Sequence, residues 1–263
     1  MGVYYNTANA ADYLKLKGVD ISSADRRLIL NAIKEMVDAG LWDKIHRLYV
    51  PIWGDEVPNA ICWKSFTSGK FVNTVIQGDG FVDGDRIGYF NTGFIPSENG
   101  LTSDIYLCAL RYTLAGGNQD LIGGYSNATT ARYVLRTGDG PASVFGAGPH
   151  YTNDRVYVSS PTPDRTGILS YSAKLSEGIF FADRESGGRS ILGTDTYTTQ
   201  TGSPPTVPLY CMASNQNGSA GLLDGASHGF WIIGDGLTDS EDETLTLIMK
   251  NLWEGLTGLS IPS

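Results

Sequence analysis

Residues 227–255 read SHGFWIIGDGLTDSEDETLTLIMKNLWEG, and they are the most informative segment of the chain. A short apolar strand, Gly229–Ile233, leads into a Gly-Asp-Gly turn and then into a helix. Thr238 and Glu241 have the spacing of a capping box, in which each side chain accepts a hydrogen bond from the other residue's backbone amide. The helix then carries an apolar stripe at helical spacing, which needs a core to pack on: Leu245, Ile248, Met249, Leu252 and Leu256.

The composition favours many short strands. Glycine makes up 33 of 263 residues, tyrosine 14, and charged residues only 18%. Between residues 51 and 234, strand-like segments alternate with turn clusters such as Gly-Asp-Gly, and no helical periodicity interrupts them. The sequence predicts strands at Phe71–Ile76, Arg86–Thr92, Asp104–Thr113, Ala131–Arg136, Arg155–Ser159, Gly167–Lys174, Gly178–Arg184, Val207–Ala213 and Gly229–Ile233. It therefore predicts a mainly β fold, an antiparallel β-sandwich, rather than a parallel α/β sheet.

A helix is predicted ahead of this β region. It begins at Ser22 or Ser23 and ends near Gly40, which suits a left-handed cap. Leu41–Leu48 reads as one or two further helical turns, and Pro51 stops any helix. We expect three parts: an N-terminal arm and helical anchor (residues 1–50), the sandwich (residues 51–236), and a C-terminal helix packed on it (residues 237–263). The two helical parts are expected to lie near each other.

Charge and cysteine content restrict the function classes. The net charge is −9 and the isoelectric point is near 4.7, and no Lys/Arg cluster is present, which disfavours nucleic-acid binding. No apolar run reaches the roughly 18 residues of a membrane span, and no signal peptide is visible. Cys62, Cys108 and Cys211 are widely spaced, so we expect buried free thiols and folding in a reducing cytosol.

Two segments carry a family resemblance. Residues 85–96 read DRIGYFNTGFIP and residues 104–111 read DIYLCALR. Together they resemble the concanavalin A-like or laminin-G-like jelly roll, in which a strand ends in T-G-F-x-P and an alternating strand follows. In the second segment Tyr106, Cys108 and Leu110 would share one face of the strand. The opposite face would carry Ile105, Leu107, Ala109 and Arg111.

The two ends of the chain resemble bacteriophage tail-type proteins built on that jelly roll. The matching segments are DAGLWDKIHRLYVPIWGDEVPNAICW at residues 38–63 and FWIIGDGLTDSEDETLTLIMKNL at residues 230–252. The resemblance implies a virion structural protein, made in the host cytoplasm, that serves as a tail or head fibre or decoration module. It further implies a lectin-like domain for host-surface carbohydrate, and partners among other virion proteins and its own copies, including trimers.

No catalytic site is predicted. The E-x-D-x-x-E pattern of glycosidases on this fold is missing, and Asp183 and Glu185 read as charges at a strand end. His46, His150 and His228 have no G-x-S-x-G partner. We therefore expect a protein that is not an enzyme. The alternatives are a glycan-degrading enzyme on the same fold and a purely structural virion module.

Two loops are candidate binding sites. Asp79, Asp83 and Asp85 offer three carboxylates to a structural Ca²⁺, although Asp-Gly pairs equally suit a plain hairpin. No other cofactor is predicted. The candidate glycan site combines aromatic faces with polar side chains, and it consists of one loop and one further tyrosine: His150, Tyr151, Asn153, Asp154, Arg155 and Tyr197. The alternative interpretation of the loop is an ordinary polar hairpin.

Overall fold

The computed structural model describes most of the chain. The described residues are 11–12, 14, 18–76, 82–83, 86–101, 104–113, 117, 119–127, 131–137, 144–147, 155–158, 166–174, 177–184, 188–196 and 203–262.

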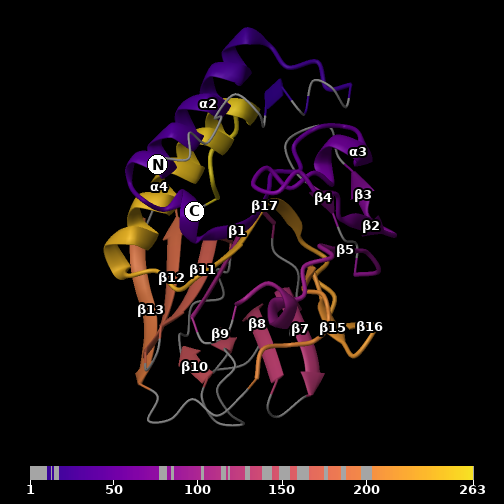
Figure 1. The fold of residues 1–263 in the computed structure, drawn as a ribbon, viewed down its shortest axis with the longest axis vertical. Coiled ribbons are helices and arrows are strands. Elements are labelled where there is room, and N and C mark those ends of the chain that lie inside the picture. Colours follow the sequence, from indigo (N-terminus) through magenta and orange to yellow (C-terminus); the bar gives the residue numbers. More distant parts are fainter. Residues whose placement is uncertain are drawn as a thin grey trace.

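The protein is a β-sandwich of two large sheets, with the long helices stacked on one of them (Figure 1). The first sheet has the order β13 (Gly188–Thr196), β12 (Glu177–Arg184), β11 (Gly167–Lys174), β6 (Ile105–Arg111), β17 (Ser227–Gly234), β4 (Val82–Asp83) and β3 (Val75–Ile76), and β1 (Ile45–Tyr49) also pairs with β17. The second has the order β10 (Arg155–Val158), β9 (Val144–Ala147), β8 (Ala131–Thr137), β7 (Gln119–Asn127), β14 (Tyr210–Cys211), β5 (Tyr89–Asn91) and β2 (Lys70–Val72). Its hairpin of β15 (Ser214–Gln216) and β16 (Ser219–Gly221) pairs in parallel with β7, while the other pairings are antiparallel. The predicted antiparallel sandwich of the jelly-roll type is confirmed.

The alternation predicted for β6 is also confirmed. Tyr106, Cys108 and Leu110 belong to the cluster under the helices. Ile105, Leu107 and Ala109 belong to the core between the sheets. Each face of this central strand is buried against a different layer, so all seven of its residues are buried.

Both long helices begin where the sequence indicates, and α2 also ends near the predicted Gly40. Helix α2 (Ser23–Asp38) is capped by Ser22, and the following Gly40 has φ +70°. Helix α4 (Asp239–Thr257) carries the complete Thr238–Glu241 capping box. Shorter helices are the 3₁₀ turn Trp42–Lys44, α3 (Glu56–Asn59) and the 3₁₀ turn Pro96–Glu98.

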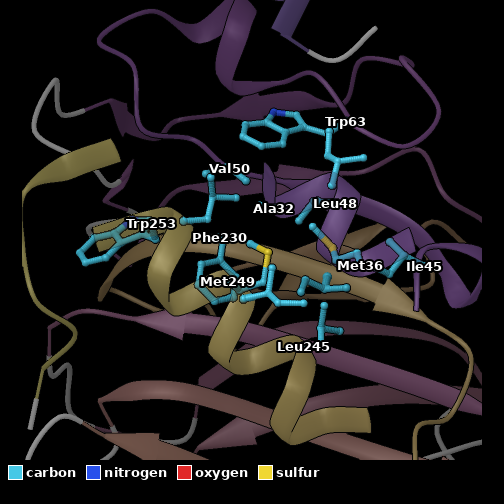
Figure 2. Packing of buried hydrophobic residues seen from close by; sticks show 14 of the residues in the cluster. Ala32, Met36, Ile45, Leu48, Val50, Trp63, Phe230, Leu245, Met249 and Trp253 are labelled. Atoms are coloured by element: carbon cyan, nitrogen blue, oxygen red, sulfur yellow. The ribbon is translucent and has the colours of Figure 1, made fainter. Parts of the chain in front are cut away.

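The two long helices pack side by side over the first sheet, as predicted (Figure 1). Figure 2 shows Met249 of α4 beside Phe230 of β17, with Met36 of α2 farther to the right in the same cluster, and all three side chains have no exposed surface. The apolar stripes of both helices are thus buried against one sheet. Within the described residues, no helix is long and apolar enough to cross a membrane.

Strand β17 contains a bulge at Gly229, where helix α4 packs against it. The register with β6 shifts between His228 and Phe230, so His228 and Trp231 come together on the inner face. A Cβ atom at Gly229 would lie 2.5 Å from Nε1 of Trp253 in α4 and 2.6 Å from Cδ2 of Leu110. Only glycine allows the indole of Trp253 to approach β17 so closely.

Several local expectations were wrong. The segment Leu41–Leu48 was predicted to be helical, but only the 3₁₀ turn Trp42–Lys44 is. Strand β1 follows this turn because its backbone pairs with the edge of β17. The predicted strand Phe71–Ile76 divides at Asn73, which has φ +52°, into β2 and β3 on different sheets. Of Val207–Ala213, only β14 is strand. The domain limits at residues 50 and 236 stay a prediction.

The three cysteines are buried and form no disulfide, as predicted. Burial raises the pKa of the Cys211 thiol well above its ordinary value, so the thiol stays protonated.

Candidate binding face on the second sheet

One row of residues crosses the outer face of the second sheet. Lys70 pairs with Asn91, Asn91 with Tyr210, and Tyr210 with Gly123. The row continues from Gly123 through Val134 and Ala147 to Arg155 at the β10 edge. Directly opposite residues share a face. The row therefore defines the side of the sheet that points away from the sandwich interior, whereas the neighbouring Phe71 and Phe90 lie in the inner core.

Two tyrosines are stacked on this face. Tyr89 in β5 and Tyr210 in β14 are diagonal neighbours, with ring centroids 4.5 Å apart and planes inclined by 22°. Tyr210 is 6% exposed and Tyr89 is half-buried, so Tyr89 presents the accessible surface of the pair. Burial, and then the neighbouring Tyr89 hydroxyl, raises the pKa of Tyr210. Tyr210 therefore stays an uncharged phenol able to donate a hydrogen bond.

A rigid aromatic core supports the tyrosine pair from behind. Phe90 lies between Tyr89 and Asn91 in sequence and points inward, where its ring stacks on Trp231 at 5.4 Å and 10°. Phe71 of the adjacent strand lies 4.5 Å from Phe90. Because these side chains are almost fully buried, strand β5, which carries both Tyr89 and Asn91, has little freedom to move.

The β15–β16 hairpin lies beside the tyrosine pair. A Cβ atom at Gly123, the residue opposite Tyr210, would come within 2.9 Å of the Cβ atom of Ser214, so β15 approaches the β7 backbone closely at this position. The Asn217 amide donates to the Tyr125 carbonyl at 2.9 Å, and the Asn215 side chain donates to the Pro208 carbonyl at 3.0 Å. The exposed hairpin tip presents amide side chains at Gln216 and Asn217.

A buried ion pair lies farther along the same face. The Arg136 guanidinium holds both carboxylate oxygens of Asp120, with the Nη2 to Oδ2 distance at 3.0 Å, and it also donates to the Tyr125 hydroxyl. Burial raises the pKa of Asp120, and hydrogen bonds from Arg136, Ser214 and Tyr125 offset only part of that effect. The pair fixes β8 to β7 beneath the hairpin.

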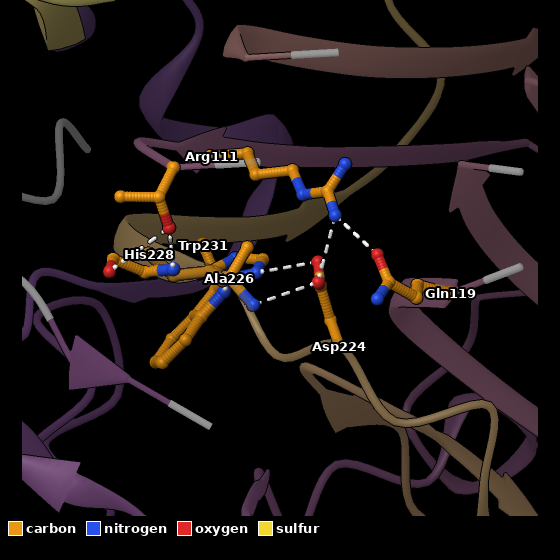
Figure 3. A network of polar contacts seen from close by, with 8 residues as sticks. Arg111, Gln119, Asp224, Ala226, His228 and Trp231 are labelled. Atoms are coloured by element: carbon orange, nitrogen blue, oxygen red, sulfur yellow. Dashed lines mark hydrogen bonds and ion pairs between the residues drawn. The ribbon is translucent and has the colours of Figure 1, made fainter. Parts of the chain in front are cut away.

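A second polar network lies in the sandwich interior, at the base of the hairpin (Figure 3). Asp224 accepts from Arg111 at 3.0 Å and from the Ala226 amide at 3.0 Å, and its other oxygen contacts His228 Nε2 at 3.0 Å. Arg111 also donates to Gln119. Burial favours a higher pKa for Asp224, but the His228 hydrogen bond and the Arg111 charge outweigh it and hold this pKa below its ordinary value.

This network is structural rather than catalytic. Trp231 Nε1 donates to His228 Nδ1 at 3.0 Å, which requires a lone pair on Nδ1 and places the imidazole proton on Nε2, facing Asp224. Both imidazole nitrogens are thus engaged, and His228 is fully buried. The histidine therefore holds β17 and the hairpin base together and has no accessible nitrogen for general-base chemistry.

The predicted site residues are mostly untested. Asp79, Asp85, His150, Tyr151, Asn153, Asp154, Tyr197 and Glu185 lie outside the described residues. Asp83 lies in β4 of the first sheet and Asp183 in β12, where only their backbones are described. Arg155 alone is placed by register in the row that contains Tyr210. Within the described part of the chain, no cluster of His, Cys, Asp or Glu could hold a metal ion.

Sequence reasoning did not find the tyrosine pair. The sequence does indicate the position of one member, Tyr89, because an inward-facing Phe90 in the segment YFN implies that Tyr89 and Asn91 face outward. The partner Tyr210 belongs to a distant segment, and only the sheet order brings β14 next to β5.

Comparison with known proteins establishes the fold. No protein-family model and no curated protein matches the chain. Domain 4 of AbnA, an extracellular GH43 arabinanase from Geobacillus stearothermophilus solved with arabinotriose, matches with a TM-score of 0.51 and 11% identity, over 77% of this chain and 98% of that domain. A Trypanosoma rangeli sialidase in complex with 2,3-difluorosialic acid matches with a TM-score of 0.54 and 10% identity, over 86% of this chain and 40% of the sialidase chain. The chain thus shares the fold of these two structures, and it spans less than half of the sialidase.

Proposed function

We propose that this protein is a non-enzymatic glycan-binding module and that the outer face of the second sheet is its binding surface. The observation that carries the proposal is the stacked pair Tyr89–Tyr210 on a sheet backed by the aromatic core of Phe71, Phe90 and Trp231. The shared fold supports it, because the arabinanase domain was solved with arabinotriose.

The chemistry of the face suits a saccharide. The C–H surface of a sugar ring packs on an aromatic face, and Tyr89 is the accessible ring of the pair. Next to Tyr210 in the row, Asn91 is held in place because its Oδ1 atom accepts from the Gly93 amide at 2.9 Å. Its amide nitrogen is the donor that a sugar hydroxyl would meet. Stacking on a tyrosine and hydrogen bonding to a fixed amide together define a lectin-like subsite.

The experiment is a glycan-array screen followed by titration calorimetry on the strongest binder. Tyr89→Ala removes the stacking surface and should weaken binding about tenfold, equivalent to about 1.4 kcal/mol. Tyr89→Phe keeps the ring and should bind within about threefold of the natural protein. Leu247→Ala is the matched control, because Leu247 is 54% exposed on α4 over the opposite sheet. Unchanged affinity in Tyr89→Ala, or the same loss in Leu247→Ala, would contradict the proposal.

We further propose that the module belongs to a bacteriophage virion and acts in host-surface adhesion, as a tail or head fibre or decoration module. The support is the resemblance of residues 38–63 and 230–252 to tail-type virion proteins. The amphipathic helices at both ends would attach it to other virion proteins or to its own copies, in a closed oligomer such as a trimer. Size-exclusion chromatography with light scattering tests the oligomer, and immunogold labelling of purified particles tests the location. If the protein is a monomer and is absent from purified particles, the proposed virion role is wrong, and the proposal of glycan binding is unaffected.

A further inference from the structure

We infer that the outer face of the second sheet selects an anionic, carboxylate-bearing saccharide, with Lys70 as the residue that pairs with the carboxylate. The inference rests on the proposed function and adds the ligand class to it.

The first support is the distribution of charge. The chain as a whole carries −9, with 28 acidic and 19 basic residues. The strands of the second sheet reverse this balance, because they contain a single acidic residue, Asp120, against four basic residues: Lys70, Arg132, Arg136 and Arg155. The strands of the first sheet show no such excess, with four acidic and five basic residues among them: Asp83, Glu177, Asp183 and Asp195 against Arg47, Arg111, Lys174, Arg184 and Arg189.

The second support is that the basic residues share the outer face. Lys70 and Arg155 occupy the two ends of the cross-strand row through Tyr210. Arg132 and Arg136 lie two residues either side of Val134, which is part of the same row, so strand alternation puts them on the same side. The one acid of these strands, Asp120, is already neutralised by Arg136. Arg136 is engaged by Asp120 and Arg132 is buried, so among the described side chains of these strands Lys70 is the one that exposes its positive charge on this face.

The third support is the placement of Lys70 relative to the tyrosines. Lys70 pairs with Asn91, so it is a diagonal neighbour of Tyr89, about 7–8 Å away in an antiparallel sheet. A lysine side chain can span that distance to a substituent of a sugar stacked on Tyr89. Lys70 is exposed, and no carboxylate lies within ion-pair distance of it among the residues that the structure describes. Its charge is available to a ligand.

The test uses saccharide pairs that differ only in the carboxylate. Oligogalacturonates, alginate oligomers and hyaluronan fragments are compared with their carboxyl-reduced forms by titration calorimetry at 50 mM and 500 mM NaCl. We expect the carboxylated member of at least one pair to bind about tenfold more tightly at low salt and to lose most of that preference at high salt. Lys70→Gln should weaken the carboxylated member about five- to tenfold and leave the reduced member unchanged.

Two controls separate the possible failures. Lys174→Gln removes an exposed lysine at the end of β11 on the first sheet and should change nothing. Duplex DNA tests for unspecific attraction to polyanions, and we expect it not to bind at 150 mM NaCl.

Equal, Tyr89-dependent binding of carboxylated and reduced saccharides would overturn the inference and leave the glycan-binding function standing. DNA binding that depends on Lys70 would overturn the inference as well. Absence of binding by every saccharide, on the array and in these pairs, would overturn the proposed function together with it.

Discussion

Replacing Asp224 by alanine should destabilise the protein severely, although the residue lies in a loop. The carboxylate is fully buried and is the common partner of Arg111, which is 1% exposed, and His228, which has no exposed surface. Removing it leaves a buried guanidinium without its counter-charge. Breaking a buried ion pair on one side costs about 3–5 kcal/mol. Since domains are stable by about 5–15 kcal/mol, the variant should keep only a fraction of its free energy of unfolding.

The measurements are urea denaturation and thermal unfolding, each monitored by tryptophan fluorescence and circular dichroism. For a chain of this size a loss of about 4 kcal/mol corresponds to a decrease of about 10 °C in Tm. The matched control is Asp235→Ala, which removes a carboxylate that also contacts a histidine, His46, at 2.9 Å but is 45% exposed. Exposed pairs contribute about 0–1 kcal/mol, so this control should shift Tm by at most a few degrees.

A second variant distinguishes charge from shape. In Arg111→Met/Asp224→Leu both charges are replaced by apolar side chains, and this double variant should recover much of the stability that Asp224→Ala loses. The reasoning is refuted if Asp224→Ala loses less than about 1 kcal/mol, or if it and Asp235→Ala are equally destabilised.

Three further predictions concern stability. Thr238→Ala removes the cap of α4 and should lower the free energy of unfolding by about 1 kcal/mol in urea denaturation; no change would mean that the capping box contributes nothing. Gly229→Ala puts a Cβ atom 2.5 Å from Trp253 and should destabilise by about 1–3 kcal/mol with a shift in tryptophan emission, whereas an unaffected variant would contradict the close approach. Because the pKa of Asp224 is lowered in the folded protein, its stabilisation is complete above the ordinary Asp pKa and is lost as pH falls through the folded value. The free energy of unfolding should therefore depend less on pH in the acid range in Asp224→Asn than in the natural protein. The same pH dependence in both proteins would refute this.

The sequence predicted what depends on local pattern. The caps of α2 and α4 were found because Ser22 and the Thr238–Glu241 pair act on amides within the same helical turn. The two faces of β6 were found because alternation needs no knowledge of the neighbours. These features are set by residues within a few positions of one another.

What failed depends on distant partners. Ile45–Tyr49 has the composition of a helix end and becomes a strand because the edge of β17 accepts it. His228 faces inward only because of the bulge at Gly229. The tyrosine pair likewise exists only once β14 is inserted between β5 and β7, an arrangement that no local pattern specifies.

The central position of β17 has a consequence for biosynthesis. This strand pairs with β6 on one side and with β1 and β4 on the other, so it joins parts of the chain made early with parts made in the middle. Until residues 227–234 leave the ribosome, β6 and β1 both present unpaired edges, and the contacts that close the sheet span most of the sequence. We therefore expect the nascent chain to stay aggregation-prone and to need chaperone protection, with cooperative folding only after translation has passed β17.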